Sequence, residues 1–352
     1  MPHPLAEFYQ GKRVLVSGHT GFSGGWLAAW LKLLGAKVSG YGSPPSTRPN
    51  FFDATLLDRG MTSIFGDLRD REALANVFAG SQPEIVIHYA AQVSAQRAVL
   101  DPVEAFATNA MGTVHILEEA RHIEPLRAVV IANSDQCYEN SGSHREQDPL
   151  GGDDPYSSSA ASVELAASAY IGAFFHDGKI AVATARTGSV IGGGDWAEGE
   201  LIPEIVRGIT SETKIVVREP SVVRPWQHVL EPVRGHLLLA QKLYEQDQNF
   251  SGAWNFGPRD EDAIAVRQLA ESFVKQWGTG KLAFNPDKNA SQPVIRLNTQ
   301  KVQTQLGWSP ALTIEDAITW TVEWYKTFYA DPASSWRTTE DQIQRYMRSS
   351  GV

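Results

Sequence analysis

In the first half of the chain, short apolar runs alternate with longer segments in which apolar residues recur every three or four positions. The short runs are typical of buried parallel strands, and the longer segments are typical of helices that cover such a sheet. Together they predict an α/β fold with a doubly wound parallel sheet. The predicted strands are residues 14–16, 37–41, 63–67, 84–91, 127–134 and 181–187, and the predicted helices are residues 26–34, 70–79, 101–122 and 156–175.

The turn after the first predicted strand carries the spacing GxxGxxG, with glycines at Gly18, Gly21 and Gly24. Such glycines let the turn tighten and let the backbone approach a pyrophosphate, which the positive end of the following helix dipole favours. The strand, turn, helix and next strand together predict a nicotinamide dinucleotide site, and a purely structural turn is the alternative. Asp67 would lie near the adenine. The choice between NAD and NADP stays open, because the nearest arginine, Arg48, lies in a proline-rich loop.

The alternation of strands and helices weakens after residue 187. Residues 214–218 still predict a short strand, and no long linker or internal repeat interrupts the chain. We therefore expect a Rossmann domain over residues 1–187, with room for later segments to return to it. A smaller substrate-binding lobe would be formed mainly by residues 188–352.

Composition narrows the possible partners. The chain of 352 residues has 31 Lys+Arg against 40 Asp+Glu and a net charge of −9, which does not favour a nucleic-acid or membrane-surface partner. Cys137 is the single cysteine, so an internal disulfide is impossible. The sequence shows neither a signal peptide nor an apolar run long enough to span a bilayer. We expect a cytoplasmic protein without a metal site.

Polar residues cluster where the predicted parallel strands end, and ligands of such sheets bind at that edge. The relevant segments are Ala90-Ala91-Gln92, Ser134-Asp135-Gln136-Cys137-Tyr138 and Asp154-Pro155-Tyr156. We expect these segments to meet at one site.

These segments and several others resemble CDP-glucose 4,6-dehydratases, which are extended short-chain dehydrogenases/reductases. The resemblance covers most of the chain, and the run Arg224-Pro-Trp-Gln-His228 is its most specific part. The other segments that carry it are Gly18-His-Thr-Gly-Phe22, Gly24-Gly-Trp26, Ser134 to Asn140, Pro149-Leu-Gly-Gly152, Asp154-Pro-Tyr-Ser157, Ile191 to Trp196, Trp254 to Pro258 and Leu306 to Pro310.

The resemblance implies a reaction in which bound NAD takes hydride from C4 of a hexose, a base removes the C5 proton, water leaves C6 and hydride returns to C6. Ser134 and Tyr156 would bind the 4-oxygen, and Asp135 would be the acid at C6. The implied cofactor-binding residues are Gly18, Gly21, Phe22, Gly24, Asp67, Leu68, Ala90, Ala91 and Tyr156. The implied contacts to a cytidine diphosphate sugar are Gln92, Asn109, Gln136, Arg186, Ser189, Arg224 and His228.

Some positions depart from the pattern that the resemblance implies. The lysine of the YxxxK motif is Ala160, and the basic residue after the catalytic aspartate is Gln136. A neighbouring cation lowers a tyrosine pKa of about 10 by about 1–3 units, so its loss predicts proton removal roughly 10- to 1,000-fold slower. Three further departures are Ser23 for a lysine, Gln96 for an arginine that stands one place later as Arg97, and Ser189 for an asparagine.

Three hypotheses follow from these departures. The chain is a sugar-nucleotide-modifying enzyme with altered or weakened chemistry, such as epimerisation; an ordinary dehydratase with a substitute base such as His88 or His144; or a non-catalytic sugar-nucleotide binder. In each case we expect a homodimer through helices at residues 101–122 and 156–175, with close approach at Ala160, Ala161 and Ala167.

Overall fold

The computed structural model describes residues 4–139, 141–245, 248–285 and 295–351, so Asn140 of the resemblance lies outside the described residues. Its central feature is a seven-stranded sheet in which every paired neighbour is parallel. The order across the sheet is β3-β2-β1-β4-β5-β7-β12. The strands are β1 (Arg13–Ser17), β2 (Lys37–Gly42), β3 (Thr62–Phe65), β4 (Ile85–His88), β5 (Ala128–Ser134), β7 (Ala181–Thr187) and β12 (Gly252–Phe256).

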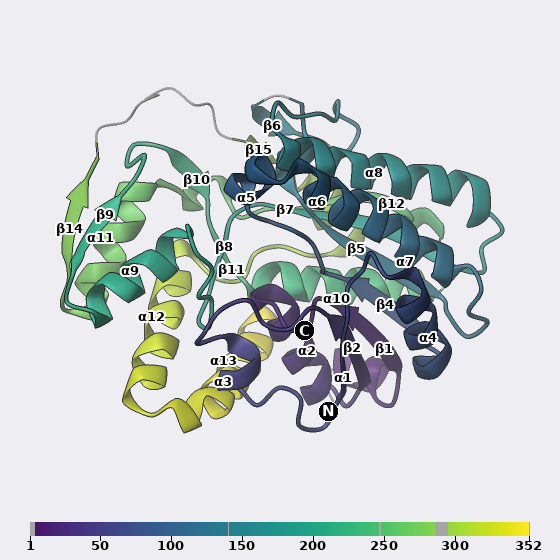
Figure 1. Ribbon diagram of the computed structural model, residues 1–352, viewed down its shortest axis with the longest axis horizontal. Helices are drawn as coiled ribbons and strands as arrows, with labels where there is room; N and C mark the ends of the chain where they lie inside the picture. The colour runs from purple at the N-terminus through teal and green to yellow at the C-terminus, as the bar shows by residue number, and fades with distance from the viewer. Residues whose placement is uncertain (1–3, 140, 246–247, 286–294, 352) are drawn as a thin grey trace.

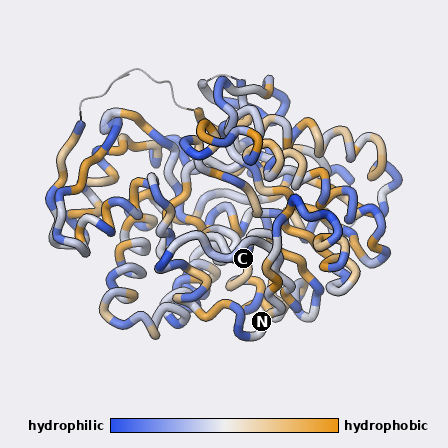
Figure 2. The backbone as a smooth tube through the Cα atoms, in the orientation of Figure 1, coloured by the Kyte–Doolittle hydropathy of each residue, from blue (hydrophilic) through white to orange (hydrophobic). Residues whose placement is uncertain are grey.

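Helices cover both faces of this sheet, because side chains of successive strand residues point to opposite faces. One hydrophobic core joins Val14, Val16 and Val130 to α2 (Phe22–Leu33) and α10 (Leu230–Tyr244). The other core joins Leu15 and Val129 to the remaining helices. These helices are α4 (Arg71–Ser81), α7 (Gly112–Ala120) and α8 (Pro155–Phe174). Figure 2 shows hydrophobic and hydrophilic stretches alternating along the outer helices, as expected of one-sided packing.

A smaller lobe packs beside the carboxyl ends of the strands (Figure 1). It contains three small two-stranded sheets, β8–β11, β10–β13 and β9–β14. The elements are β8 (Val190–Ile191), α9 (Leu201–Thr210), β9 (Lys214–Val217), β10 (Val223–Pro225), β11 (Gln227–His228), β13 (Ala263–Ala265), α11 (Val266–Trp277), β14 (Lys281–Phe284), α12 (Ile314–Ala330) and α13 (Ser335–Ser350). The remaining elements are α1 (Pro4–Tyr9), α3 (Phe51–Ala54), α5 (Ala95–Leu100), α6 (Pro102–Phe106), β6 (Gly142–His144) and β15 (Ile295–Leu297).

The structure confirms the α/β class and the six strands predicted up to residue 187. Several bounds differ from the prediction. β4 ends at His88, so Ala90 and Ala91 lie beyond it. β3 ends at Phe65, so Asp67 lies two residues beyond it. The predicted helix over residues 101–122 is α6 followed by a π-helical turn (Ala107–Met111) and α7.

Later segments do return to the large domain. β12 pairs with β7 at the edge of the main sheet, and α10 belongs to one of its cores. Among the described residues, no helix is long and apolar enough to cross a membrane.

The glycine turn between β1 and α2 is built by close backbone contacts. Gly18 has φ 77°, and a Cβ there would lie 2.6 Å from the backbone nitrogen of Ala90. A Cβ at Gly24 would lie 2.2 Å from the carbonyl oxygen of Gly18. Real Cβ atoms do not approach that closely, so larger residues would force this turn apart.

We expect Gly24→Ala to lower the free energy of unfolding by about 1–3 kcal/mol, because the new methyl group overlaps the Gly18 carbonyl. Gly80→Ala is the matched control. Gly80 lies within α4, where a methyl group would meet no neighbouring atom within 4 Å in the described part of the chain. Alanine there should be neutral or stabilising by up to about 1 kcal/mol. Urea unfolding measures both variants. Equal stability of the two would contradict the close contact.

Candidate active site

The carboxyl end of β5 brings together Ser134, Asp135 and Tyr156. Ser134 ends the strand, and Asp135 begins a 3₁₀ turn (Asp135–Cys137). The Ser134 hydroxyl donates to Asp135 Oδ1 at 3.3 Å and accepts from the Gln136 amide at 3.1 Å. It also hydrogen-bonds with the Tyr156 hydroxyl. The three residues that the resemblance implies for catalysis therefore form one connected cluster.

The start of α8 places Tyr156 in this cluster. Asp154 is the N-cap, and its carboxylate accepts from the amides of Tyr156 at 2.8 Å and Ser157 at 3.1 Å. Pro155 occupies the first helical turn, where its missing N–H costs nothing. A capped start fixes the first turn of a helix, so Asp154 and Pro155 are positioning residues for Tyr156.

Asp135 is buried and polar. It is 6% exposed, and a Cβ at Gly188 would lie 2.9 Å from its Oδ2 atom. Burial raises the pKa of Asp135 to about 6, although hydrogen bonds from Gln136 and Ser134 and the charge of Arg224 oppose that rise. A carboxyl group that titrates near pH 6 can donate a proton near neutral pH.

The surroundings of Tyr156 disfavour its ionised form. Burial raises its pKa to about 12, the Ser134 hydrogen bond opposes the rise, and the carboxylates of Asp135 and Glu200 add to it. One turn further along α8, Ala160 is 3% exposed within an apolar cluster that includes Cys137 and Tyr138. The helix therefore presents a methyl group where the resemblance implies an ammonium group.

A second buried cluster ties β4 to α8. Asn109 lies in the π-helical turn, and its Oδ1 accepts from the Gln92 amide at 2.7 Å. Its Nδ2 donates to the Gln92 carbonyl and to Ser159 Oγ, both at 2.9 Å. Gln92 Oε1 in turn accepts from Ser94 N at 2.7 Å. π-Helical turns are frequent at functional sites, and this one brings an amide side chain against the segment that follows β4.

The residues implied for a dinucleotide suit that group. Gly18 and Gly24 leave no room for side chains at the turn, and Gly21, the N-cap of α2, forms no side-chain cap. The amides of the first helical turn therefore remain free for an anion. Further along, Asp67 forms an ion pair with Arg69 at 2.5 Å, and hydrogen bonds from Arg69 hold its pKa below the usual range.

The other implied cofactor residues lie around this turn. Phe22 packs against the Gly192 turn, because a Cβ at Gly192 would lie 3.0 Å from its ring. Leu68 is 4% exposed and packs close to Gly112, while Ala90 is half-buried and Ala91 is exposed.

Arg186 and His228 differ from the expected role as substrate contacts. Arg186 is 2% exposed, and its guanidinium pairs with Glu164 at 2.8 Å and donates to the Tyr138 hydroxyl at 2.6 Å. His228 is fully buried next to Trp26, and burial lowers its pKa to about 3. Both side chains are therefore packed in the interior, Arg186 against Glu164 and His228 between the rings of Trp26 and Trp320.

The remaining implied contacts are more open. Arg224 is exposed, and its charge acts on Asp135. Gln136 is half-buried, and its amide Nε2 donates to Asp135 Oδ1 at 3.4 Å. Ser189 is half-buried, and its carbonyl accepts from the Gln227 amide at 3.1 Å.

The two histidines considered as substitute bases, His88 and His144, contact other side chains of the chain. His88 Nδ1 lies 2.5 Å from Ser17 Oγ, and burial lowers the pKa of His88 to about 4. His144 is 8% exposed and stacks on Tyr138, with 4.4 Å between the ring centroids. Neither arrangement supports a role as the base. Among the described ranges, no group of three or more His, Cys, Asp or Glu could hold a metal ion.

Residues 14–257 match the NAD dependent epimerase/dehydratase family. The chain belongs to this family. It is 42% identical over 332 residues to the CDP-glucose 4,6-dehydratase of Salmonella typhimurium, across 92% of each chain. It is 27% identical over 274 residues to a dTDP-glucose 4,6-dehydratase of Streptomyces niveus, across 76% of this chain and 77% of that one.

Solved structures of epimerases have the same fold. The UDP-glucose 4-epimerase of Thermotoga maritima, solved with UDP-glucose, superposes with a TM-score of 0.77 at 20% identity, over 90% of this chain and 99% of that one. This family member therefore has the architecture of an extended sugar-nucleotide dehydratase or epimerase.

The sequence analysis missed Glu200. It is the N-cap of α9, yet its side chain forms no capping hydrogen bond. Although Glu200 is exposed, desolvation by its neighbours raises its pKa, the charge of Arg224 opposes that rise, and its carboxylate acts on Tyr156. A glutamate directly before an apolar helix start was the available signal, since Ser, Thr, Asp and Asn are preferred there.

The raised pKa of Asp135 predicts a pH-dependent stability. Because the folded pKa of about 6 exceeds the unfolded value of about 4, the folded state binds more protons between these pH values. This contribution to stability is fully present below pH 4 and is lost as the pH rises through 6. Asp135→Asn should flatten that slope and raise the free energy of unfolding at pH 7 by about 3 kcal/mol at most. Urea unfolding from pH 4 to 7 measures it, and parallel curves for the two proteins would contradict the assignment.

Proposed function

We propose that this family member is an NAD-dependent enzyme that modifies a cytidine diphosphate sugar through a transient 4-keto sugar, with weakened 4,6-dehydration. One observation carries the proposal. Ser134, Asp135 and Tyr156 form a connected cluster at the sheet edge, and the carboxylates of Asp135 and Glu200 raise the pKa of Tyr156.

The glycine turn would hold the cofactor pyrophosphate at the N-terminus of α2, and Asp67 with Leu68 would lie at the adenine. When bound, the nicotinamide would take hydride from C4 of the sugar and return it at C6. NAD is supported by the family description. The chain's own residues leave NADP open.

The chain's residues would handle oxygen and protons. The hydroxyls of Ser134 and Tyr156 would hold the 4-oxygen of the sugar, with Tyr156 as the group that accepts its proton. Asp135, with its pKa near 6, would give a proton to the 6-hydroxyl so that it leaves as water, while solvent water takes the C5 proton. Arg224, which is exposed, would meet a negatively charged group of the sugar nucleotide.

The same geometry supports slow chemistry. With a pKa of about 12, Tyr156 is ionised in roughly one molecule in 10⁵ at pH 7. Gln136 beside Asp135 carries an amide that does not titrate usefully, so a basic group worth about 10²–10⁴ in rate is missing there. The cytidine preference is supported by the 42% identity to the Salmonella enzyme.

We expect the unmodified protein to convert CDP-glucose to the 4-keto-6-deoxy sugar slowly or undetectably with added NAD. Gln136→Lys together with Ala160→Lys should raise the rate, and each single change should help less. Ala160→Lys should also lower thermal stability, because its side chain begins within the apolar cluster of Cys137 and Tyr138. The assays are loss of one water by mass spectrometry and the absorbance of the 4-keto product in alkali.

Gln241→Lys, on α10 away from the cluster, controls for the added charge. Fast dehydration by the unmodified protein would refute weakened chemistry. Binding of NAD and CDP-glucose without reduction of NAD in any variant would instead favour a non-catalytic sugar-nucleotide binder. Reduction of NAD with a different product would favour altered chemistry such as epimerisation.

A homodimer is proposed through the helical segments first expected, extended to α5, but with other side chains at the contact. Ala160, Ala161 and Ala167 are 3%, 6% and 1% exposed, so they pack inside the chain rather than against a partner. Large apolar side chains are exposed instead on α5, α6, the π-helical turn and α8. They are Val99, Leu100, Val103, Phe106, Met111 and Leu165, with Leu100 at 85% and Val103 at 76% exposure. A second copy would cover this face, since monomers rarely expose large apolar patches.

We expect Val103→Glu to convert the dimer to monomer at micromolar concentration, because it places a charge in the apolar face. Val216→Glu is the matched control: Val216 on β9 is 45% exposed and lies outside that face. Light scattering reports the mass of both variants. A monomeric unmodified protein, or a dimer that survives Val103→Glu, would rule out this interface.

A further inference from the structure

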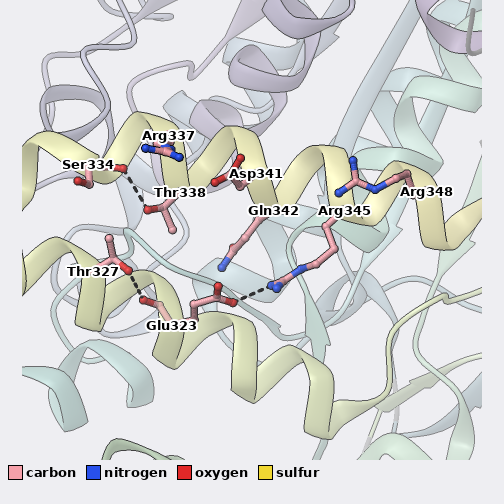
Figure 3. Close-up of a pocket in the computed structure, with 9 residues that line it drawn as sticks. All are labelled: Glu323, Thr327, Ser334, Arg337, Thr338, Asp341, Gln342, Arg345 and Arg348. Atoms are coloured by element: carbon pink, nitrogen blue, oxygen red, sulfur yellow. Dashed lines mark hydrogen bonds and ion pairs between the residues drawn. The ribbon is translucent and has the colours of Figure 1, made fainter.

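A cavity of about 490 Å³ lies between the two C-terminal helices, and its lining includes no residue of the Ser134–Asp135–Tyr156 cluster. Figure 3 shows α13 beside α12, with Gln342 and Arg345 reaching from α13 toward α12. Its volume lies within the range of about 300–1,000 Å³ that small-molecule sites occupy. The lining residues are Glu323, Thr327, Ser334, Arg337, Thr338, Asp341, Gln342, Arg345 and Arg348.

Three arginines give the cavity its chemistry. Arg345 is held in place, because its Nη2 pairs with Glu323 at 2.7 Å and its guanidinium lies 3.9 Å from the centre of the Trp320 ring. Arg337 and Arg348 are exposed, and neither forms an ion pair with any described residue. A planar guanidinium matches two phosphate oxygens at once, so arginines without carboxylate partners favour a phosphate group.

The other walls offer hydrogen-bond acceptors. The Asp341 carboxylate is exposed and forms no ion pair within the described part of the chain. Gln342 is 1% exposed; its Nε2 donates to the Trp320 carbonyl at 2.8 Å, which leaves Oε1 without a partner among the described residues. The hydroxyls of Thr327 and Thr338 donate within their own helices, so their oxygens remain acceptors. Acceptors repel phosphate but suit hydroxyl groups.

We propose that this cavity binds a small phosphate monoester that carries free hydroxyl groups. Sugar phosphates and nucleoside monophosphates share this chemistry. Arg337 and Arg348 hold the phosphate, and Asp341 accepts from the hydroxyl groups.

The floor of the cavity lies close to the dinucleotide helix. Trp320, which Arg345 covers, packs against His228 with 5.8 Å between ring centroids, and His228 packs against Trp26 of α2 at 5.9 Å. The site is thus separated from α2 by two aromatic rings. Its binding does not depend on the proposed reaction, since the two sites share no residue.

Isothermal titration of the full chain with glucose 1-phosphate, cytidine 5′-monophosphate and inorganic phosphate tests the proposal. We expect at least one of the two organic probes to bind about tenfold or more weakly to Arg337→Gln/Arg348→Gln. The two substituted arginines are not part of the proposed active site, so probe binding there is unchanged. Any loss of affinity in this variant therefore comes from the cavity. If this variant loses affinity for glucose 1-phosphate, the ligand of the cavity is a sugar phosphate. If it loses affinity for cytidine 5′-monophosphate, the ligand is a nucleotide. Asp341→Asn should weaken the organic probe while inorganic phosphate binds no less tightly.

The control Arg59→Gln/Arg71→Gln removes the same charge outside the cavity and should bind like the unmodified protein. Circular dichroism confirms that each variant is folded. Equal binding of both organic probes by the unmodified protein and Arg337→Gln/Arg348→Gln would overturn the proposal. So would an equal loss in the control, or an Asp341→Asn variant that leaves binding of the organic probes unchanged.

Discussion

The buried ion pair between Arg186 and Glu164 is the interaction on which the arrangement of the site depends. Both side chains are 3% exposed, so the pair is almost completely removed from water. Glu164 also accepts from Thr184 and Asn133, both at 2.7 Å, which joins α8 to β7 and β5. Removing one partner of a buried pair costs about 3–5 kcal/mol because the other charge is left unpaired. The pair therefore fixes the position of α8 along strands β5 and β7, and with it the position of Tyr156.

The same network supports the turn that carries Asp135. Arg186 donates to the Tyr138 hydroxyl at 2.6 Å, and that hydroxyl donates to Asn255 Oδ1 at 2.8 Å. Tyr138 directly follows the 3₁₀ turn, and Asn255 belongs to β12. One set of buried hydrogen bonds thus connects the last strand of the sheet to both walls of the site. Arg186 is buried behind the site, where it holds Glu164 and the Tyr138 hydroxyl in place.

Strong periodicity made most of the large domain predictable. The six strands of the first half are apolar runs of the right length, and the glycine spacing located the turn whose close contacts the structure shows. β12 was harder to recognise, because the place of Gly252–Phe256 is set by pairing with β7, which is far away in sequence. The hydrophobic pattern of a segment does not reveal which distant strand it pairs with.

Side-chain orientation was the other gap in the sequence analysis. The cluster of Ser134, Asp135 and Tyr156 followed from strand ends and a resemblance, but the resemblance could not show that Arg186 and His228 point into the interior. The alanines of α8 were mistaken for an exposed face, because small residues suit both close core packing and helix pairing. Glu200 went unnoticed since its approach to Tyr156 depends on how the small lobe folds over the sheet.

The late return of the chain to the main sheet affects how the protein can be made. Five elements of the small lobe, β8, α9, β9, β10 and β11, lie in sequence between β7 and β12. A ribosome must therefore synthesise these lobe segments before the seventh strand exists. Until then, β7 is an open sheet edge with unpaired backbone groups, which is the kind of surface that associates with other chains. The nascent protein has to keep that edge covered for the time needed to add about 65 residues, from Thr187 to Gly252.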